Sequence, residues 1–202
     1  QLSDLAIYDN VLTYGQVRDV MSNGVSAAPI DLPTSARPDG TIAHYLLDGP
    51  LGSIANGATI LDETGNHDGT VLVDTLSYVA GKNGSALHFE GDAETSHRNA
   101  APNDDDWQIR PGESFTVETI FRTTASGTLG IISKNGNGGE CWMRLQDGEV
   151  RFYMGDGGIL PSIDVQSNDS LGEVANTGDW VHVAAVYDSS AEELRLFLNG
   201  AL

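Results

Sequence analysis

The chain has 202 residues, 29 of them acidic and 10 basic, and a formal net charge of −19 at pH 7. This length suits one ordinary domain with extra segments and is enough to bury a sizeable core. The charge argues against a nucleic-acid partner and is compatible with cation binding. The single cysteine, Cys141, excludes an internal disulfide framework and a multi-cysteine zinc site. No apolar run is long enough for insertion into a membrane.

Residues 1–24 predict one strand followed by a short helix. Leu2 to Tyr8 read as the strand. Thr13 and Gln16 then have the spacing of a capping box, in which two side chains at the start of a helix satisfy its free backbone donors. Gly24 supplies the residue that ends a helix in a left-handed conformation. This segment is typical of the end of a fold rather than its beginning.

Residues 25–40 contain three prolines among small polar residues, which is typical of a linker. Short strands separated by turn residues are predicted from Thr41 onward, and no amphipathic helix of ordinary length interrupts them. The predicted strands are Ile42 to Leu47, Ser85 to Phe89, Ser114 to Arg122, Leu129 to Ser133, Glu140 to Gln146, Glu149 to Gly155, Trp180 to Tyr187 and Leu194 to Leu198. The pattern favours an all-β, antiparallel β-sandwich or jelly roll, with a barrel as the alternative.

The hairpin around Asp147–Gly148 carries a candidate binding face. A two-residue turn there pairs Trp142 with Tyr153 and Arg144 with Arg151. These four side chains share the face opposite the predicted core, and an aromatic pair beside forked cationic donors is what a saccharide-binding surface offers. The alternative is that they pack under a loop or a neighbouring domain, since cross-strand aromatic pairs also stabilise ordinary sheets. The predicted core face comprises Cys141, Met143, Leu145, Val150, Phe152 and Met154.

Several segments resemble one known family in matching order. GSALHFEGD, SFTVETIFRT, GIISKNG, WMRLQDGEVRFYMGDG and GDWVHVAAVYDSSAEELRLFLNGAL are similar to the bacterial laminin-G-like, concanavalin A-like jelly-roll domain. The resemblance covers about Thr41 to Leu202. The opening LSDLAIYDNVLTYGQVRDVM resembles the last strand and terminal helix of the same family, and the strands that normally precede that ending are missing. AETSHRNA also replaces the usual aromatic after the EGD turn, which weakens the case for a ligand contact there.

The order of these pieces predicts a window cut from a longer, repetitive protein. We assign residues 1–24 to the closing strand and helix of a preceding or exchanged laminin-G-like unit, 25–40 to a linker and 41–202 to a jelly roll lacking its final strands. Two further arrangements remain open, because the first strand could close its own domain or be donated to a neighbouring chain. Asn199–Gly200 predicts a hairpin turn, but the strand that should follow this turn is missing. The preceding strand would then be an exposed edge of the sheet, and each of the three arrangements would cover that edge.

An oxygen-rich loop at Asp62–Gly69 is a candidate calcium site. Its side-chain oxygens fall on alternate residues and it ends in glycine, as in loops that wrap a hard cation, although it lacks the terminal glutamate of an EF-hand. The resemblance implies a structural Ca²⁺ near this loop, which would place the ion on Asp62, Asn66 and Asp68. The alternative is a solvated turn rich in Asp and Asn.

A catalytic role is the weakest of the functional hypotheses. Glu90 to Glu94 resembles the Glu-x-Asp-x-Glu strand of retaining glucanases, but Gly91–Asp92 is typical of a strand exit. We therefore expect a non-enzymatic, secreted or cell-surface module for binding and adhesion within a multidomain or tandem-repeat protein. Its expected partners are a glycan or a surface protein, and neighbouring repeats or copies of the same protein. The alternative class is a structural repeat of a surface fibre or sheath.

Overall fold

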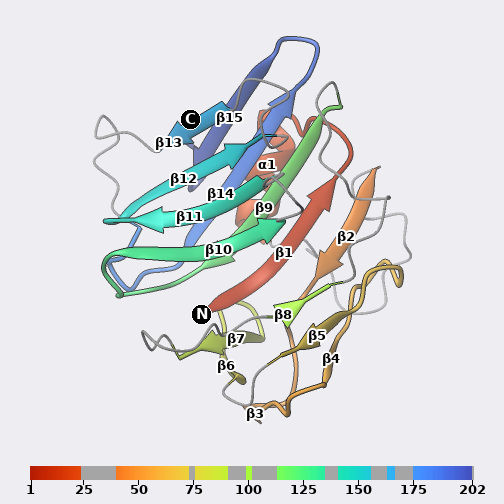
Figure 1. Ribbon diagram of the computed structural model, residues 1–202, viewed down its shortest axis with the longest axis vertical. Coiled ribbons are helices and arrows are strands. Elements are labelled where there is room, and N and C mark those ends of the chain that lie inside the picture. The colour runs from red at the N-terminus through yellow and green to blue at the C-terminus, as the bar shows by residue number, and fades with distance from the viewer. Residues whose placement is uncertain are drawn as a thin grey trace.

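The structure, a computed structural model, describes residues 1–23, 40–72, 76–90, 99–101, 113–134, 141–155, 163–166 and 175–201. The largest of its three sheets has eight strands (Figure 1). The strands of this sheet are β1 (Leu2–Tyr8), β2 (Thr41–Tyr45), β3 (Gly52–Ser53), β6 (Leu76–Ala80), β7 (Ser85–Phe89), β9 (Phe115–Phe121), β14 (Val181–Asp188) and β15 (Glu193–Leu198). Their order is β15-β14-β9-β1-β7-β6-β3, and β2 also pairs with β1.

Two smaller sheets and one helix complete the described part of the chain. A four-stranded sheet has the order β10 (Thr128–Lys134), β11 (Cys141–Gln146), β12 (Glu149–Met154) and β13 (Ile163–Gln166). A three-stranded sheet contains β4 (Thr59–Ile60), β5 (Gly69–Val71) and β8 (Asn99–Ala100), and α1 spans Tyr14–Asn23. Every pairing between these strands is antiparallel, which confirms the all-β sandwich expected from the alternating sequence.

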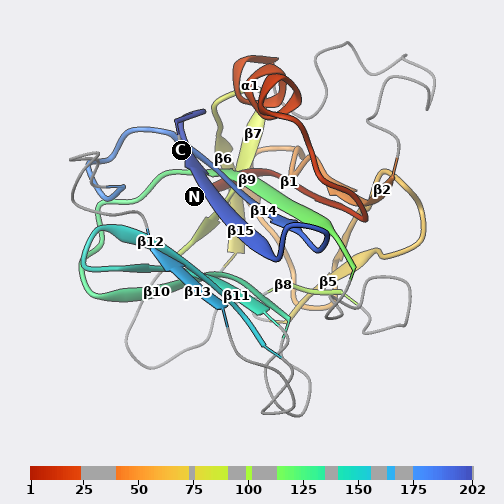
Figure 2. The same ribbon diagram turned by 90° about the horizontal axis from the view of Figure 1, so that it is seen from above.

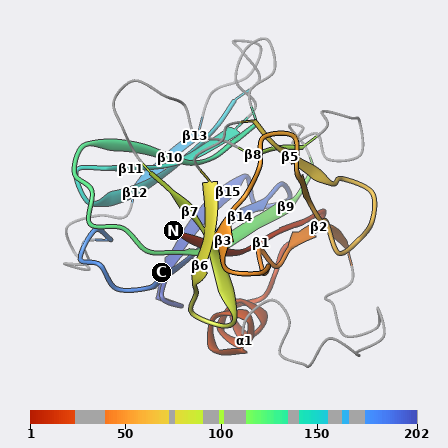
Figure 3. The same cartoon turned by 90° about the horizontal axis from the view of Figure 1, so that it is seen from below.

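The helix and the two larger sheets form three layers. Figures 2 and 3 show α1 on one side of the eight-stranded sheet and the four-stranded sheet on the other. The main core lies between the two sheets and includes Val117 of β9, Met143 of β11, Phe152 of β12 and Val183 of β14, all at most 1% exposed. A second, smaller core that includes Tyr8, Val17 and Phe197 packs α1 against the opposite face. The four-stranded sheet therefore has one buried face and one outer face.

Strand β1 lies in the interior of the large sheet. It pairs with β9 on one side and with β2 on the other, and Leu2 additionally pairs with Leu87 of β7. In the structure, the N-terminal strand therefore completes the sheet of its own chain, which is the second of the three arrangements considered from sequence. Its origin at the end of a preceding repeat stays a prediction.

Helix α1 begins as its sequence predicts. The backbone N–H of Thr13 donates to Oε1 of Gln16 at 2.9 Å, and the backbone N–H of Gln16 donates to Oγ1 of Thr13 at 3.3 Å. This reciprocal pair is the predicted capping box. Leu12 and Val17 are buried on the face that packs against the large sheet. None of the helices in the described residues is long and apolar enough to cross a membrane.

The C-terminal turn closes as a two-residue hairpin. Asn199 and Gly200 have φ of 48° and 74°, as a type I′ turn requires. Leu198 and Ala201 exchange backbone hydrogen bonds of 2.8 Å in both directions. Leu194, Leu196 and Leu198 face the main core, as the alternation of β15 predicts.

Candidate functional site

The hairpin β11–β12 has the register that its sequence predicts. Asp147 and Gly148 form the turn with φ of 53° and 94°, conformations that a type I′ turn needs at both central positions. Trp142 lies opposite Tyr153, and Arg144 lies opposite Arg151. All six residues of the predicted core face are buried: Cys141, Met143, Leu145, Val150, Phe152 and Met154. Trp142, Arg144, Arg151 and Tyr153 therefore occupy the outer face, where each is partly exposed.

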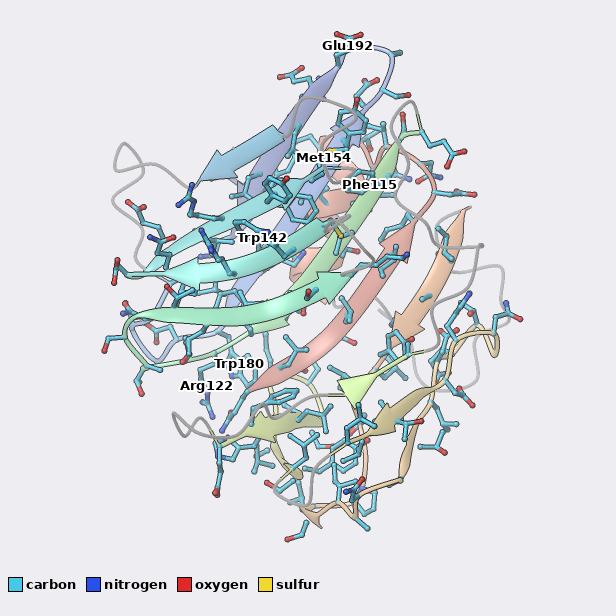
Figure 4. All side chains as sticks on the ribbon, in the orientation of Figure 1. Phe115, Arg122, Trp142, Met154, Trp180 and Glu192 are labelled. Atoms are coloured by element: carbon cyan, nitrogen blue, oxygen red, sulfur yellow. The ribbon has the colours of Figure 1, made fainter. Side chains whose placement is uncertain are left out.

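The aromatic pair on this face is stacked. The rings of Trp142 and Tyr153 have centroids 5.1 Å apart and planes inclined by only 10°. Next to them, Cζ of Arg144 lies 4.0 Å from the centroid of the Trp142 ring, in a cation–π contact. Figure 4 shows Trp142 on β11 in the front layer, away from the large sheet. We call the four residues Trp142, Arg144, Arg151 and Tyr153 the outer cluster.

Contacts within the sheet hold the outer cluster in place. The ring of Tyr153 lies over the backbone of Gly155, where a side chain would collide with it. Nη1 of Arg151 donates to Oε1 of Gln146 at 3.0 Å. The stack and the cation–π contact fix ring and guanidinium orientations before any ligand arrives, which lowers the entropy lost on binding. The arrangement can offer an apolar ring surface beside planar hydrogen-bond donors.

The loop predicted to bind calcium is organised around Asp62, whose residue is only 4% exposed. Oδ1 accepts hydrogen bonds from the backbone N–H groups of His44 at 2.7 Å and Thr64 at 3.1 Å. Oδ2 accepts from the N–H groups of His67 at 3.0 Å and Asn66 at 3.3 Å, and from the hydroxyl of Thr64. These donors occupy the carboxylate on both oxygens.

These hydrogen bonds also determine the acidity of Asp62. Burial alone would raise the pKa of this carboxyl, but the donors from His44, Thr64 and His67 outweigh burial and hold its pKa below the usual value. The other two predicted ligands, Asn66 and Asp68, are exposed, and Oδ1 of Asp68 accepts from the backbone N–H of Asp62 at 2.9 Å.

The donors around Asp62 compete with a cation for the carboxylate oxygens. The described residues contain no group of three or more His, Cys, Asp or Glu side chains placed to hold a metal ion. A calcium ion on Asp62 would have to displace donors that the loop itself supplies. Calcium at Asp62, Asn66 and Asp68 stays a prediction from the sequence.

A buried polar cluster under α1 was not predicted as a unit. The hydroxyl of Tyr8 donates to Oε1 of Glu118 at 2.5 Å, and Nε2 of His182 lies 3.2 Å from Oε2 of the same carboxylate. Burial and the negative charge of Glu118 raise the pKa of Tyr8. All three residues are at most 1% exposed, so the cluster joins β1, β9 and β14 rather than facing a ligand. The signal in the sequence is Glu118, the one charged residue within the strand FTVETIF.

A second Trp–Arg contact lies apart from the outer cluster. Cζ of Arg122 lies 4.8 Å from the centroid of the Trp180 ring, and the Arg122 guanidinium also donates to Oε1 of Gln1. Figure 4 places this pair near the start of β1, away from Trp142. The Arg122 guanidinium thus already has a side-chain acceptor within the chain. The Arg122–Trp180 pair therefore provides a control for substitutions in the outer cluster.

The possible catalytic glutamates are not brought together in the part of the chain that the structure describes. Glu90 directly follows β7 and is exposed, and Glu94 lies outside the described residues. The absence of enzymatic activity stays a prediction.

A comparison with protein families identifies the fold. Residues 92–202 match the laminin G family model described as the concanavalin A-like lectin/glucanases superfamily. The chain belongs to this superfamily. The matched range includes the whole β11–β12 hairpin, and membership suggests a carbohydrate- or surface-binding module. No curated protein and no solved structure matches the chain.

Proposed function

We propose that this chain is a non-catalytic, extracellular binding module, secreted or held at a cell surface as part of a larger protein, that binds a saccharide on the outer face of the β10–β13 sheet. The observation that carries the proposal is the stack of Trp142 on Tyr153 with the Arg144 guanidinium over the indole ring. Apolar ring surface attracts the C–H faces of sugars, and guanidinium groups donate to hydroxyl or carboxylate oxygens.

Two features of the outer cluster support a ligand role beyond sheet stabilisation. Arg144 and Arg151 are directly opposite each other on neighbouring strands, where like charges destabilise a sheet. Trp142 and Tyr153 also present a stacked pair of rings that is only partly buried, on the face opposite the main core. A surface that keeps aromatic rings exposed and places two like charges side by side, both of which reduce stability, is typical of a binding site.

The test is retention on a panel of immobilised polysaccharides, comparing wild type with Trp142→Ala and with Trp180→Ala as the matched control. Both variants remove an indole that contacts an arginine, but only Trp142 belongs to the outer cluster. We expect wild type and Trp180→Ala to be retained on the same polysaccharide and Trp142→Ala to run unretarded. Thermal unfolding of each variant confirms that the fold is intact.

Two outcomes contradict the proposal. Retention that Trp142→Ala leaves unchanged would place the glycan site elsewhere on the molecule. Failure of the wild type to bind any polysaccharide of the panel would favour the alternatives, recognition of a surface protein or a structural repeat of a fibre or sheath.

A further inference from the structure

Arg144 is an unusual residue in so acidic a chain. With 29 acidic residues against 10 basic ones, an arginine is expected to find a carboxylate, as Arg195 does with Glu193 at 2.7 Å. Within the part of the chain that the structure describes, Arg144 forms no ion pair, and its buried Nε has no hydrogen-bond partner. Instead it faces another arginine, Arg151, directly across the hairpin. Among the described residues, Arg144 is thus held by the Trp142 ring and not by an ion pair, although Glu149 lies on the same face, two residues from Arg151.

The surroundings of Arg144 leave room for a ligand. On its other side, Arg144 pairs with Gly130 of β10, and a Cβ added at Gly130 would meet nothing within 4 Å. The guanidinium is held against the Trp142 ring at 4.0 Å, which fixes its orientation. A guanidinium held by stacking can still present pairs of parallel N–H donors, and their spacing matches the two oxygens of a carboxylate.

We propose that Arg144 makes this face selective for a saccharide bearing a carboxylate, that is, a uronic acid residue, over the same saccharide without it. The inference rests on the proposed saccharide-binding function and names its ligand class. Arg144 donates two parallel N–H hydrogen bonds to the carboxylate oxygens while the neighbouring aromatic pair contacts the sugar ring.

The net charge of the protein further limits which saccharides fit this face. A net charge of −19 disfavours a polyanion, whereas a single carboxylate needs only a local excess of positive charge within about 8 Å, which Arg144 and Arg151 supply on a face that also carries Glu149. The fitting ligand is therefore a largely neutral polysaccharide with isolated uronic acid groups, not a continuous polyuronate.

The experiment measures binding of two oligosaccharides that differ at one group. The probes are a xylo-oligosaccharide carrying one glucuronic acid residue and its carboxyl-reduced, neutral counterpart, titrated into the full chain. We expect wild type to prefer the acidic probe by about ten- to a hundredfold, the range of a charge-assisted contact. Arg144→Gln should abolish this preference, whereas Arg122→Gln, which alters the other Trp–Arg contact, should retain it.

The outcomes separate this inference from the proposed function. Equal binding of both probes by wild type, lost in Trp142→Ala, overturns the selectivity and leaves saccharide binding in place. A preference that survives Arg144→Gln assigns the carboxylate to another residue and also overturns the inference. Binding of neither probe overturns it as well, and the proposed function fails with it only if the polysaccharide panel is also negative.

Discussion

Replacing Asp62 with alanine should destabilise the protein strongly. The carboxylate is the common acceptor of five hydrogen bonds, and two of its donors, the N–H groups of His44 and His67, belong to residues that are 1% and 2% exposed. Each buried donor left without an acceptor costs about 1–3 kcal/mol. Water can reach the exposed Asn66, so the buried pair dominates and the expected loss is about 3–5 kcal/mol in the free energy of unfolding.

Asp62→Asn separates the charge from the shape of this side chain. The amide keeps one acceptor oxygen but leaves the buried N–H of either His44 or His67 without one, so the loss should fall to about 1–3 kcal/mol, the cost of one unpaired buried donor. Asp68→Asn is the matched control in the same loop, because Asp68 is exposed. It should change stability by no more than about 0.5 kcal/mol, as surface substitutions usually do.

The pH dependence gives an independent check. The pKa of Asp62 is lowered in the folded state, so its carboxylate stabilises the fold above the unfolded pKa of about 4, and this contribution is lost as pH falls through the folded pKa. The stability difference between wild type and Asp62→Asn should be constant from about pH 7 to pH 5 and shrink below about pH 4. Urea unfolding followed by tryptophan fluorescence measures both quantities. Equal losses for Asp62→Ala and Asp68→Asn, or a difference independent of pH down to about pH 2, would refute the reasoning.

Three further predictions concern the calcium hypothesis, the buried cluster and β1. Because internal donors occupy the carboxylate of Asp62, EDTA should leave the melting temperature of the protein unchanged. A clear fall of the melting temperature on chelation would support the calcium hypothesis for this loop. Tyr8→Phe should cost about 1.5–3 kcal/mol, because buried Glu118 loses a hydrogen-bond donor, and a cost below about 0.5 kcal/mol would show that the carboxylate does not need it. A chain lacking residues 1–23 should lose cooperative unfolding, since β1 pairs on both sides within the large sheet; a stable fold without the segment would assign it to another unit.

The candidate face could be predicted from sequence because its structure is local. Asp147–Gly148 allows one turn type, and the apolar residues alternate on both sides of it, so only one register buries them together. The adjacency of Trp142 and Tyr153 follows from this register. The position of the Arg144 guanidinium over the indole ring does not follow, because a long side chain has many rotamers and only the packed sheet selects one.

The long-range parts of the structure could not be predicted in this way. Tyr8 and Glu118 are separated by 110 residues, and no turn or periodicity connects them, so the place of β1 between β2 and β9 remained one of three alternatives. The Asp62 loop shows a different limit. Alternating oxygen side chains suit either a cation or the backbone donors of the loop, and the choice depends on whether the carboxylate turns outward or inward. Short strands such as β4, β5 and β8 were also missed, because two or three residues carry no periodic signal.

The central claim is that the outer cluster binds a saccharide, and its most direct test is NMR titration of the side-chain N–H signals. The tryptophan indole and arginine Nε signals are assigned by single substitution and followed as the glucuronic acid-bearing oligosaccharide is added to ¹⁵N-labelled protein. We predict that the signals of Trp142 and Arg144 shift together and saturate, while those of Trp180 and Arg122 stay in place. Saturating shifts at Trp180 and Arg122 with none at Trp142 and Arg144 would contradict the claim.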